Sequence, residues 1–273
     1  MQATQTKQSF SKLIAFRVAF GVELKKLFKS KVFWILLGFF IFLPLMMGLL
    51  MLLVKNPELA SKMGIVSTSK AQMIGTADWA TYFSFLGQLV SIGGVFGFGF
   101  MTSWVFGREY SDKTLKDLLA LPVSRGTIVN AKLSVIGCVS LGLSVLMFVV
   151  SYGVGRAVDL GVISMSEVFR EFISFEVSTL LLICLCTPVA LFANMGRGYL
   201  LPLGLLVLIV IIAQFIGVIG LAHLFPWALP ALFFEQSHGH DSGITFISYA
   251  IWLITCVAGY VLTQYWWYKV DQT

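Results

Sequence analysis

Charged residues are scarce in this chain, and most of them lie outside its long apolar segments. Asp, Glu, Lys and Arg make up 12% of the 273 residues, whereas 58% are hydrophobic. In a soluble globular domain about a quarter of the residues are charged, so the composition indicates an integral membrane protein. The polar connections are too short to fold as a soluble domain, which needs at least about 50 residues.

The sequence also lacks the motifs of common catalytic and energy-coupling sites. It contains no G-x-x-x-x-G-K-[ST] loop for ATP, no H-E-x-x-H and no nucleophile elbow. All four cysteines (Cys138, Cys184, Cys186 and Cys256) fall within apolar runs, which indicates packing rather than a disulfide or zinc framework. We therefore expect a protein that is not an enzyme and binds no cofactor of its own.

The net charge of +6 does not predict nucleic-acid binding, because the basic residues cluster at the ends of apolar runs. Such residues orient a protein in the bilayer and contact anionic headgroups. Lys and Arg number fourteen in the connections on the side of both termini and five on the other side. The positive-inside rule therefore predicts that both termini are cytoplasmic.

Six apolar segments are long enough to cross a membrane, which takes about 20 residues in a helix. They are residues 32–54, 79–106, 133–155, 172–193, 199–221 and 244–268. Pro44 and Pro188 lie inside two of them and predict kinks, because proline removes a backbone hydrogen bond. The predicted fold is an all-α polytopic membrane protein, with residues 1–31 as an N-terminal segment and residues 32–273 as one six-span domain.

Two further segments are predicted to lie at the membrane surface. Residues 10–28 place apolar side chains at helical spacing, which predicts an amphipathic interfacial elbow helix. Arg17 falls on the apolar face, where it either snorkels or pairs with an acidic residue. Residues 225–234 are apolar but too short to span, and their prolines and Trp227 predict a re-entrant or interfacial helix on the external side.

The three histidines, His223, His238 and His240, all follow the fifth span. His238-Gly239-His240-Asp241 contains side chains that bind metals, but its glycine favours a solvated loop.

Few polar or small residues in the spans stand out. Gly93 and Gly97 form a small-xxx-small pair, which predicts that another helix approaches closely. Gln88 and Gln214 predict interhelical hydrogen bonds. Glu176 is expected near the outer end of the fourth span, where interfacial anchoring and a role in transport are both open. We interpret these five as helix-packing or pore residues.

Seven charged residues crowd into residues 107–126, between the second and third spans. Ser111 or Asp112 is predicted to cap a helix that runs to about Leu121 and stops at Pro122. Two ion pairs at i, i+4 spacing are expected on its exposed side: Asp112–Lys116 and Lys113–Asp117. An apolar stripe is expected to seat the helix on the bundle: Leu115, Leu118 and Leu119.

Three stretches of this segment resemble the signature of ABC-2 type exporter permeases. They are Arg108-Glu109-Tyr110, Thr114-Leu115-Lys116-Asp117-Leu118-Leu119 and Leu121-Pro122-Val123-Ser124-Arg125. The particular likeness is to the bacitracin-resistance type of peptide or drug exporter. The elbow, the six spans, the external Pro226-Trp227 segment and the Tyr268–Asp271 exit also suit this family.

The resemblance implies a pore formed by two permease subunits in the bacterial inner membrane, as a homodimer or a heterodimer. Each subunit would dock through residues 107–126 on a separate cytoplasmic ATP-binding cassette ATPase, which would bind the ATP and Mg²⁺. Glu109 would tie the second span to the elbow. The implied coupling residues are Glu109, Asp112, Lys113, Thr114, Leu115, Lys116, Leu118, Leu119, Pro122, Ser124 and Arg125. The uncharged spans favour an amphipathic cargo, such as a peptide, a lipid or a hydrophobic drug.

Two other functions compete with this interpretation. A self-sufficient secondary transporter or channel would work without an ATPase and would depend on Glu176. An intramembrane enzyme or assembly factor would depend on His223, His238 and His240.

Overall fold

The computed structural model describes residues 2–56, 76–120, 123–239 and 241–269, without the side chains of residues 2–12, Lys116 and Leu119. The described residues form helices and no strands. Six helical segments are long and apolar enough to cross a membrane: α2 (Lys31–Lys55), α5 (Trp79–Ser111), α7 (Arg125–Ala157), α8 with α9 (Met165–Met195), α10 (Leu200–Val218) and α12 (Phe246–Lys269). The predicted all-α fold with six candidate spans is confirmed.

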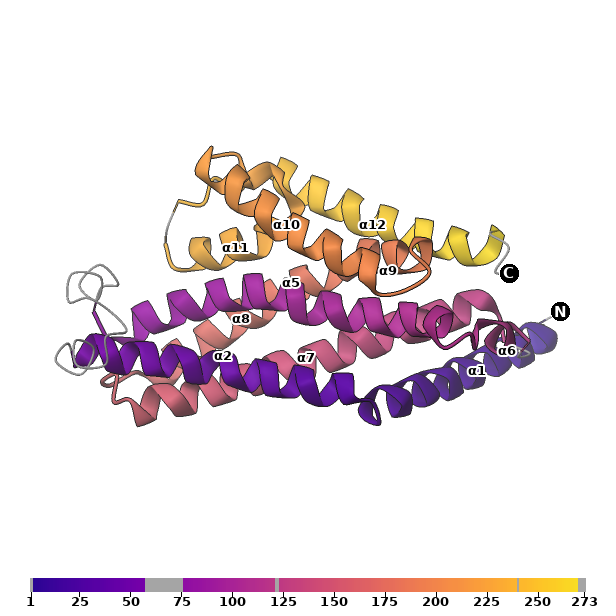
Figure 1. Cartoon of the computed structure of the whole chain (residues 1–273), viewed down its shortest axis with the longest axis horizontal. Coiled ribbons are helices and arrows are strands. Elements are labelled where there is room, and N and C mark those ends of the chain that lie inside the picture. The colour runs from indigo at the N-terminus through magenta and orange to yellow at the C-terminus, as the bar shows by residue number, and fades with distance from the viewer. Residues whose placement is uncertain (1, 57–75, 121–122, 240, 270–273) are drawn as a thin grey trace.

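The helix α5 is the centre of the bundle (Figure 1). In its most apolar stretch 72% of the residues are buried, more than in any other candidate span. Its glycines allow this packing, because side chains from three neighbouring helices occupy the space where a Cβ atom would lie. The contacts are Gly93 with Leu43, Gly97 with Phe40, Gly94 with Leu182 and Gly99 with Leu206. Side chains of α2 therefore pack against the small-xxx-small pair Gly93 and Gly97, as the sequence predicts for a neighbouring helix.

The fourth span is broken near its proline. It consists of α8 (Met165–Cys184) and α9 (Cys186–Met195). Pro188 has no N–H to donate to the carbonyl of Cys184, and the Thr187 hydroxyl donates to that oxygen instead, at 3.0 Å. The break thus lies where Pro188 predicts it, whereas α2 continues through Pro44 as one helix.

The N-terminal helix α1 (Gln2–Phe28) packs along α7. The predicted apolar face of α1 is buried near the end of the helix and exposed farther toward its start. Leu27 is fully buried near the end of α1, whereas Leu13 and Ile14 are exposed. Arg17 is exposed and forms no ion pair within the described residues, so the alternative of an acidic partner is not seen. The interfacial placement of α1 stays a prediction.

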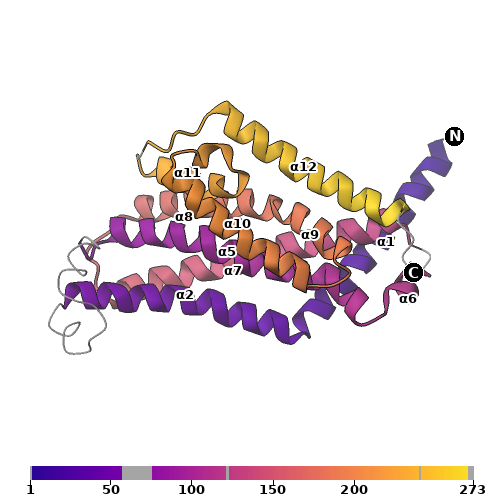
Figure 2. The same cartoon turned by 45° about the horizontal axis from the view of Figure 1, so that its top comes forward.

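Both chain termini lie at one end of the bundle, here called the termini end (Figure 1). At the opposite end, the turns η1 (Ala222–Leu224) and η2 (Pro226–Ala228) and the helix α11 (Leu229–Ser237) connect α10 to α12. A short helix therefore lies in the segment where the sequence predicts one, and its re-entrant placement stays a prediction. Figures 1 and 2 both show α12 on the side of the bundle farthest from α2.

Candidate functional site

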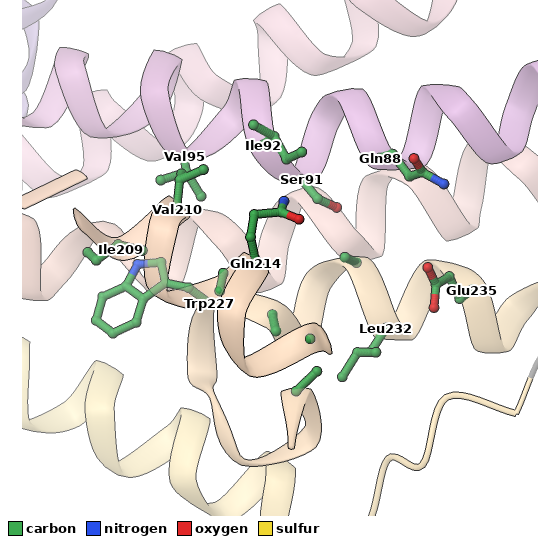
Figure 3. A pocket seen from close by; sticks show the side chains of 15 residues that line it. Gln88, Ser91, Ile92, Val95, Ile209, Val210, Gln214, Trp227, Leu232 and Glu235 are labelled. Atoms are coloured by element: carbon green, nitrogen blue, oxygen red, sulfur yellow. The ribbon is translucent and has the colours of Figure 1, made fainter. Parts of the chain in front are cut away.

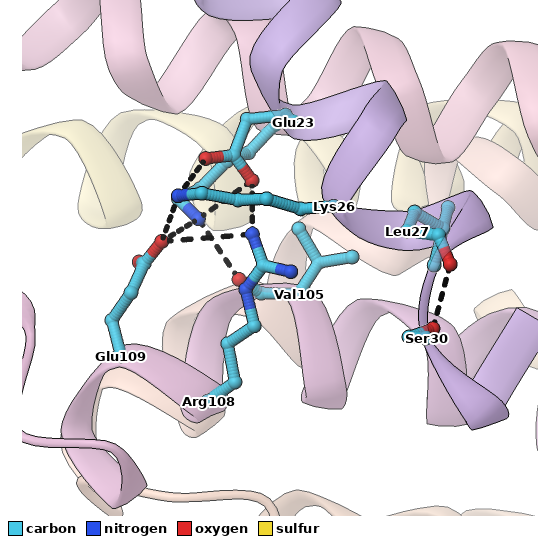
Figure 4. A network of polar contacts seen from close by, with 8 residues as sticks. Glu23, Lys26, Leu27, Ser30, Val105, Arg108 and Glu109 are labelled. Atoms are coloured by element: carbon cyan, nitrogen blue, oxygen red, sulfur yellow. Dashed lines mark hydrogen bonds and ion pairs between the residues drawn. The ribbon is translucent and has the colours of Figure 1, made fainter.

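Five charged side chains meet at the termini end of α5. Glu23 and Lys26 come from α1, Arg108 and Glu109 from α5, and Lys132 from α7. We call these five residues the ionic cluster. Figure 4 shows its side chains converging between α1 and α5.

The contacts in the ionic cluster are short. Lys132 Nζ lies 2.7 Å from Glu109 Oε1 and 3.2 Å from Glu23 Oε2, and it also donates to the carbonyl of Val105 at 2.9 Å. Arg108 Nη2 lies 2.8 Å from Glu23 Oε2. The cluster therefore holds α1, α5 and α7 together through shared charges.

Four of the five side chains of the cluster are buried, and Lys26 is partly exposed. The exposed fraction is 0% for Lys132, 2% for Glu109 and 4% for Glu23. Burial acts to raise the pKa of Glu23, but the charges of Lys132, Arg108 and Lys26 outweigh it, so the net shift is downward and Glu23 is ionised. A buried charge is tolerated only when it is paired, so the register of the three helices depends on this cluster.

The sequence analysis named one member of the cluster, Glu109, as a site residue. The family resemblance assigned Glu109 to a contact with the elbow, and Glu109 Oε1 lies 3.7 Å from Lys26 Nζ of α1. Glu23, Lys26, Arg108 and Lys132 were missed as site residues, although Arg108 lies in one of the motif stretches. The sequence does contain a signal for Glu23. This residue shares a helical face with Phe20 and Leu27, and an acidic residue on an apolar face predicts a buried cation as its partner.

The helix predicted from Ser111 or Asp112 to Leu121 is wrong at its start. Ser111 is the last residue of α5, and Lys113 has a positive φ of 57°. Thr114 N–H donates to Glu109 O at 3.0 Å and Lys113 N–H donates to Tyr110 O at 3.3 Å, which is a Schellman motif. The chain therefore turns sharply, and a separate helix, α6, covers only Leu115–Leu119.

Asp112 and Lys113 precede α6, so the two predicted ion pairs do not lie at i, i+4 positions within one helix. Lys113 and Asp117 form no ion pair, and the Lys116 side chain is outside the described residues. Leu115 is buried and Leu118 packs against the core, so the apolar stripe does seat α6 on the bundle. The predicted contributions of the Leu119 side chain and of Pro122 lie outside the described residues.

After α6, the chain enters α7 through two anchoring residues. Ser124 caps α7 by accepting a hydrogen bond from Thr127 N–H at 3.2 Å. Arg125 Nη1 donates to the carbonyl of Trp267 at 2.9 Å, near the end of α12. Cations suit the last carbonyls of a helix. Arg125 therefore joins the start of α7 to α12.

A cavity of about 320 Å³ lies between α5, α10, the η2 turn and α11, toward the opposite end of the bundle. Figure 3 shows Gln88 and Glu235 at one end of it, Ile209 and Trp227 at the other, and Gln214 between them. Apolar walls with a few polar groups are typical of small-molecule sites.

The two glutamines, Gln88 and Gln214, both line this cavity. Each is exposed in the protomer and has no hydrogen-bond partner among the described residues, so the predicted interhelical bonds are not seen. Lipid offers no partner for an amide at membrane depth. The cavity is therefore suited to water, cargo or another protein surface rather than to lipid tails.

Glu176 lies away from the cavity. It is the twelfth residue of α8, and its Oε2 accepts a hydrogen bond from Ser144 of α7 at 2.8 Å. Because α8 begins at Met165, Glu176 lies farther along the helix than the predicted span start at residue 172 suggested. Its contacts are those of a residue that packs α8 on α7.

His238 and Glu171 join α11 to α8. Nε2 of His238 lies 2.6 Å from Glu171 Oε2, and Nδ1 of His238 lies 2.8 Å from the carbonyl of Phe234. The expectation of a solvated loop is therefore wrong for His238, which is partly buried. His240 is outside the described residues, and no group of three metal-binding side chains occurs in the described ranges.

Comparison with known proteins gives two similarities. Residues 19–214 match the family described as ABC-2 family transporter protein. The chain is also 26% identical over 188 residues to the bacitracin transport permease protein BCRB of Bacillus licheniformis, an alignment that covers 67% of this chain and 88% of that protein.

Proposed function

The chain belongs to the ABC-2 family of transporter proteins, and we propose that it forms the export pore of an ATP-driven transporter together with a second permease subunit. The family and the bacitracin permease relative support an ABC transporter permease subunit. We place it in the bacterial inner membrane with the termini end in the cytoplasm, because that side carries fourteen of the nineteen Lys and Arg residues.

The observation that carries this proposal is the length and position of α5. One unbroken helix of 33 residues holds Arg108 and Glu109 of the ionic cluster near one end and Gln88 and Ser91 of the cavity toward the other. At about 1.5 Å per residue it is about 50 Å long. A force applied at the termini end is thus transmitted along a rigid element to the cavity wall.

In this proposal α6 is the docking element for an ATP-binding cassette ATPase, which binds the ATP and Mg²⁺. Asp112, Lys113, Thr114 and Asp117 are exposed around α6, while Leu115 anchors it. The exposed charges around α6 would give binding of the partner its specificity. Because α6 is anchored to the bundle, a movement of the bound partner would also move the bundle. Movement of the ATPase subunits would reach α5 and α7 through the turns on either side of α6.

A second permease subunit, identical or related, would cover the open side of the cavity and enclose Gln88 and Gln214. The apolar walls and the two amides suit an amphipathic cargo, such as a peptide, a lipid or a hydrophobic drug. The relative from Bacillus licheniformis is named for bacitracin transport, which agrees with a cargo of this class.

The test is co-purification with the ATP-binding cassette ATPase encoded beside this gene. We expect a stable complex whose ATPase activity depends on α6. Asp117→Lys reverses an exposed charge on α6 and should weaken the complex at least about tenfold, without lowering the melting temperature of the chain. Asp241→Lys makes the same change in an exposed loop at the opposite end and should leave binding intact. Binding that ignores both variants would refute docking on α6.

The alternative of a secondary transporter makes a different prediction for Glu176. Because Glu176 contacts Ser144 and does not line the cavity, we expect Glu176→Gln to keep ATP-dependent transport. Transport in liposomes by the chain alone, driven by an ion gradient and abolished by Glu176→Gln, would favour the alternative.

A further inference from the structure

The cavity between α5, α10 and α11 is lined by one formally charged side chain, Glu235 of α11. No Lys, Arg or His is among the residues that line it. Glu235 is partly buried, and its carboxylate has no hydrogen bond or ion pair with another described residue. The two ring nitrogens of His238, three residues later, contact Glu171 and the carbonyl of Phe234 rather than the carboxylate of Glu235.

The position of Glu235 on its helix is electrostatically unfavourable. α11 has nine residues, Glu235 lies in the last turn, and that turn contains no basic residue. The carboxyl end of a helix carries a partial negative charge, which disfavours an acidic side chain there. A bound cation would relieve both this repulsion and the lack of a partner for the carboxylate.

The rest of the lining is arranged around this charge. Gln88 and Glu235 lie at one end of the cavity, while Ile209 and Trp227 lie at the other end (Figure 3). The amide oxygen of Gln88 is a second acceptor for a positively charged donor, and the face of an indole attracts cations as well as apolar groups. The apolar side chains of Ile92 and Ile209 suit a hydrophobic body.

We propose that this cavity selects amphipathic cations, with Glu235 and Gln88 holding the positive group and the apolar end of the cavity holding the hydrophobic body. This selectivity rests on the proposed function, since it defines which of the amphipathic cargoes enters the pore. It predicts that charge, rather than size, separates good ligands from poor ones.

The test uses two ions of the same shape and opposite charge, tetraphenylphosphonium and tetraphenylborate. The full chain is placed in phosphatidylcholine nanodiscs without ATPase or ATP, and binding is measured by equilibrium dialysis against empty nanodiscs. An ionic strength of about 0.15 M screens surface charges beyond about 8 Å. We expect Glu235→Gln to weaken tetraphenylphosphonium binding about tenfold, as a charge-assisted contact predicts, and not to weaken tetraphenylborate binding.

Two further variants test whether tetraphenylphosphonium binds in this cavity. Glu167→Gln removes a negative charge at the same end of the bundle but outside the cavity, and glutamine preserves the capping box that starts α8. It should leave both affinities unchanged. Ile92→Trp fills the cavity and should abolish the specific binding of tetraphenylphosphonium. Conversely, Glu235→Asp keeps the charge and should retain most of the affinity.

The proposal is overturned if wild type and Glu235→Gln bind tetraphenylphosphonium equally, if Glu167→Gln loses as much, or if Ile92→Trp changes nothing. Because no ATPase is present, these results are independent of docking on α6. A functional ATPase complex without charge selectivity would leave the proposed function standing and remove only this inference.

Discussion

Replacing Lys132 with methionine tests whether the ionic cluster holds the termini end of the bundle together. Lys132 is fully buried, and methionine keeps the unbranched apolar stem and most of the length of the side chain while removing its charge. Within the described residues, the Glu109 carboxylate then loses its only hydrogen bond. The remaining cations, Lys26 and Arg108, lie 3.7 and 3.9 Å from Glu109 Oε1, beyond hydrogen-bond distance.

The magnitude follows from the burial of the carboxylate. Breaking a buried ion pair by removing one partner costs about 3–5 kcal/mol, because an uncompensated charge stays in the interior. The second oxygen of Glu109 already lacks a hydrogen-bond partner, so the carboxylate keeps only the longer ion pairs with Lys26 and Arg108. At about 2–4 °C per kcal/mol for a chain of this size, we expect Lys132→Met to lower the melting temperature by about 10 °C.

The assay is thermal unfolding in nanodiscs, followed by far-ultraviolet circular dichroism. The matched control is Lys55→Met, which removes the exposed ion pair with Asp159 and should cost no more than about 1 kcal/mol. The double variant Lys132→Met with Glu109→Gln leaves no uncompensated carboxylate, so it should be more stable than the sum of the single losses predicts, by about 1–3 kcal/mol. A loss equal to that of Lys55→Met, or strict additivity of the two changes, would refute the reasoning.

Two more predictions concern the packing around α11 and α12. The hydrogen bond with Glu171 raises the pKa of His238 above its ordinary value of 6.5. The pair therefore stabilises the fold fully below pH 6.5, and this contribution is lost as pH rises through the raised pKa. Melting temperatures measured across this pH range should show the loss, and His238→Gln should abolish the pH dependence. Gly259→Ala introduces a Cβ against the backbone of Pro188 and should destabilise the protein by about 1–3 kcal/mol in the same melting assay. The control Gly204→Ala adds a Cβ that meets no atom within 4 Å and should not destabilise it. Equal melting temperatures of the two variants would contradict this contact.

The spans were predictable from the sequence because a membrane helix must bury about 20 apolar residues in a row, and that requirement is local. The break near Pro188 was predictable for a similar reason, since a missing backbone N–H acts within one turn. In both cases the information lies within a few residues of the structural feature.

The ionic cluster was not predictable in this way, because its members are far apart in the sequence. Glu23 pairs with Arg108, 85 residues later, and with Lys132, 109 residues later. Lys132 directly precedes the predicted third span and looked like a basic residue that orients the chain. Only the packing of α1 along α7 brings its ammonium into the interior. The turn at Lys113 was missed because lysine carries no signal for a left-handed backbone, which glycine usually supplies.

The candidate spans differ in how much of each is buried within the protomer, which bears on how the proposed movement of α6 would reach the cavity. In their most apolar stretches, 72% of the residues are buried in α5, but only 17% in α10 and 22% in α12. α5 is also fixed at its termini end by the ionic cluster, whereas α10 contacts it through side chains such as Leu206 over Gly99. In the proposed mechanism, a displacement of α6 would move α5 together with α1 and α7 and would change the spacing at the contact between α5 and α10. That contact is a wall of the cavity, so the least buried part of the bundle is also the part whose movement would open or close it.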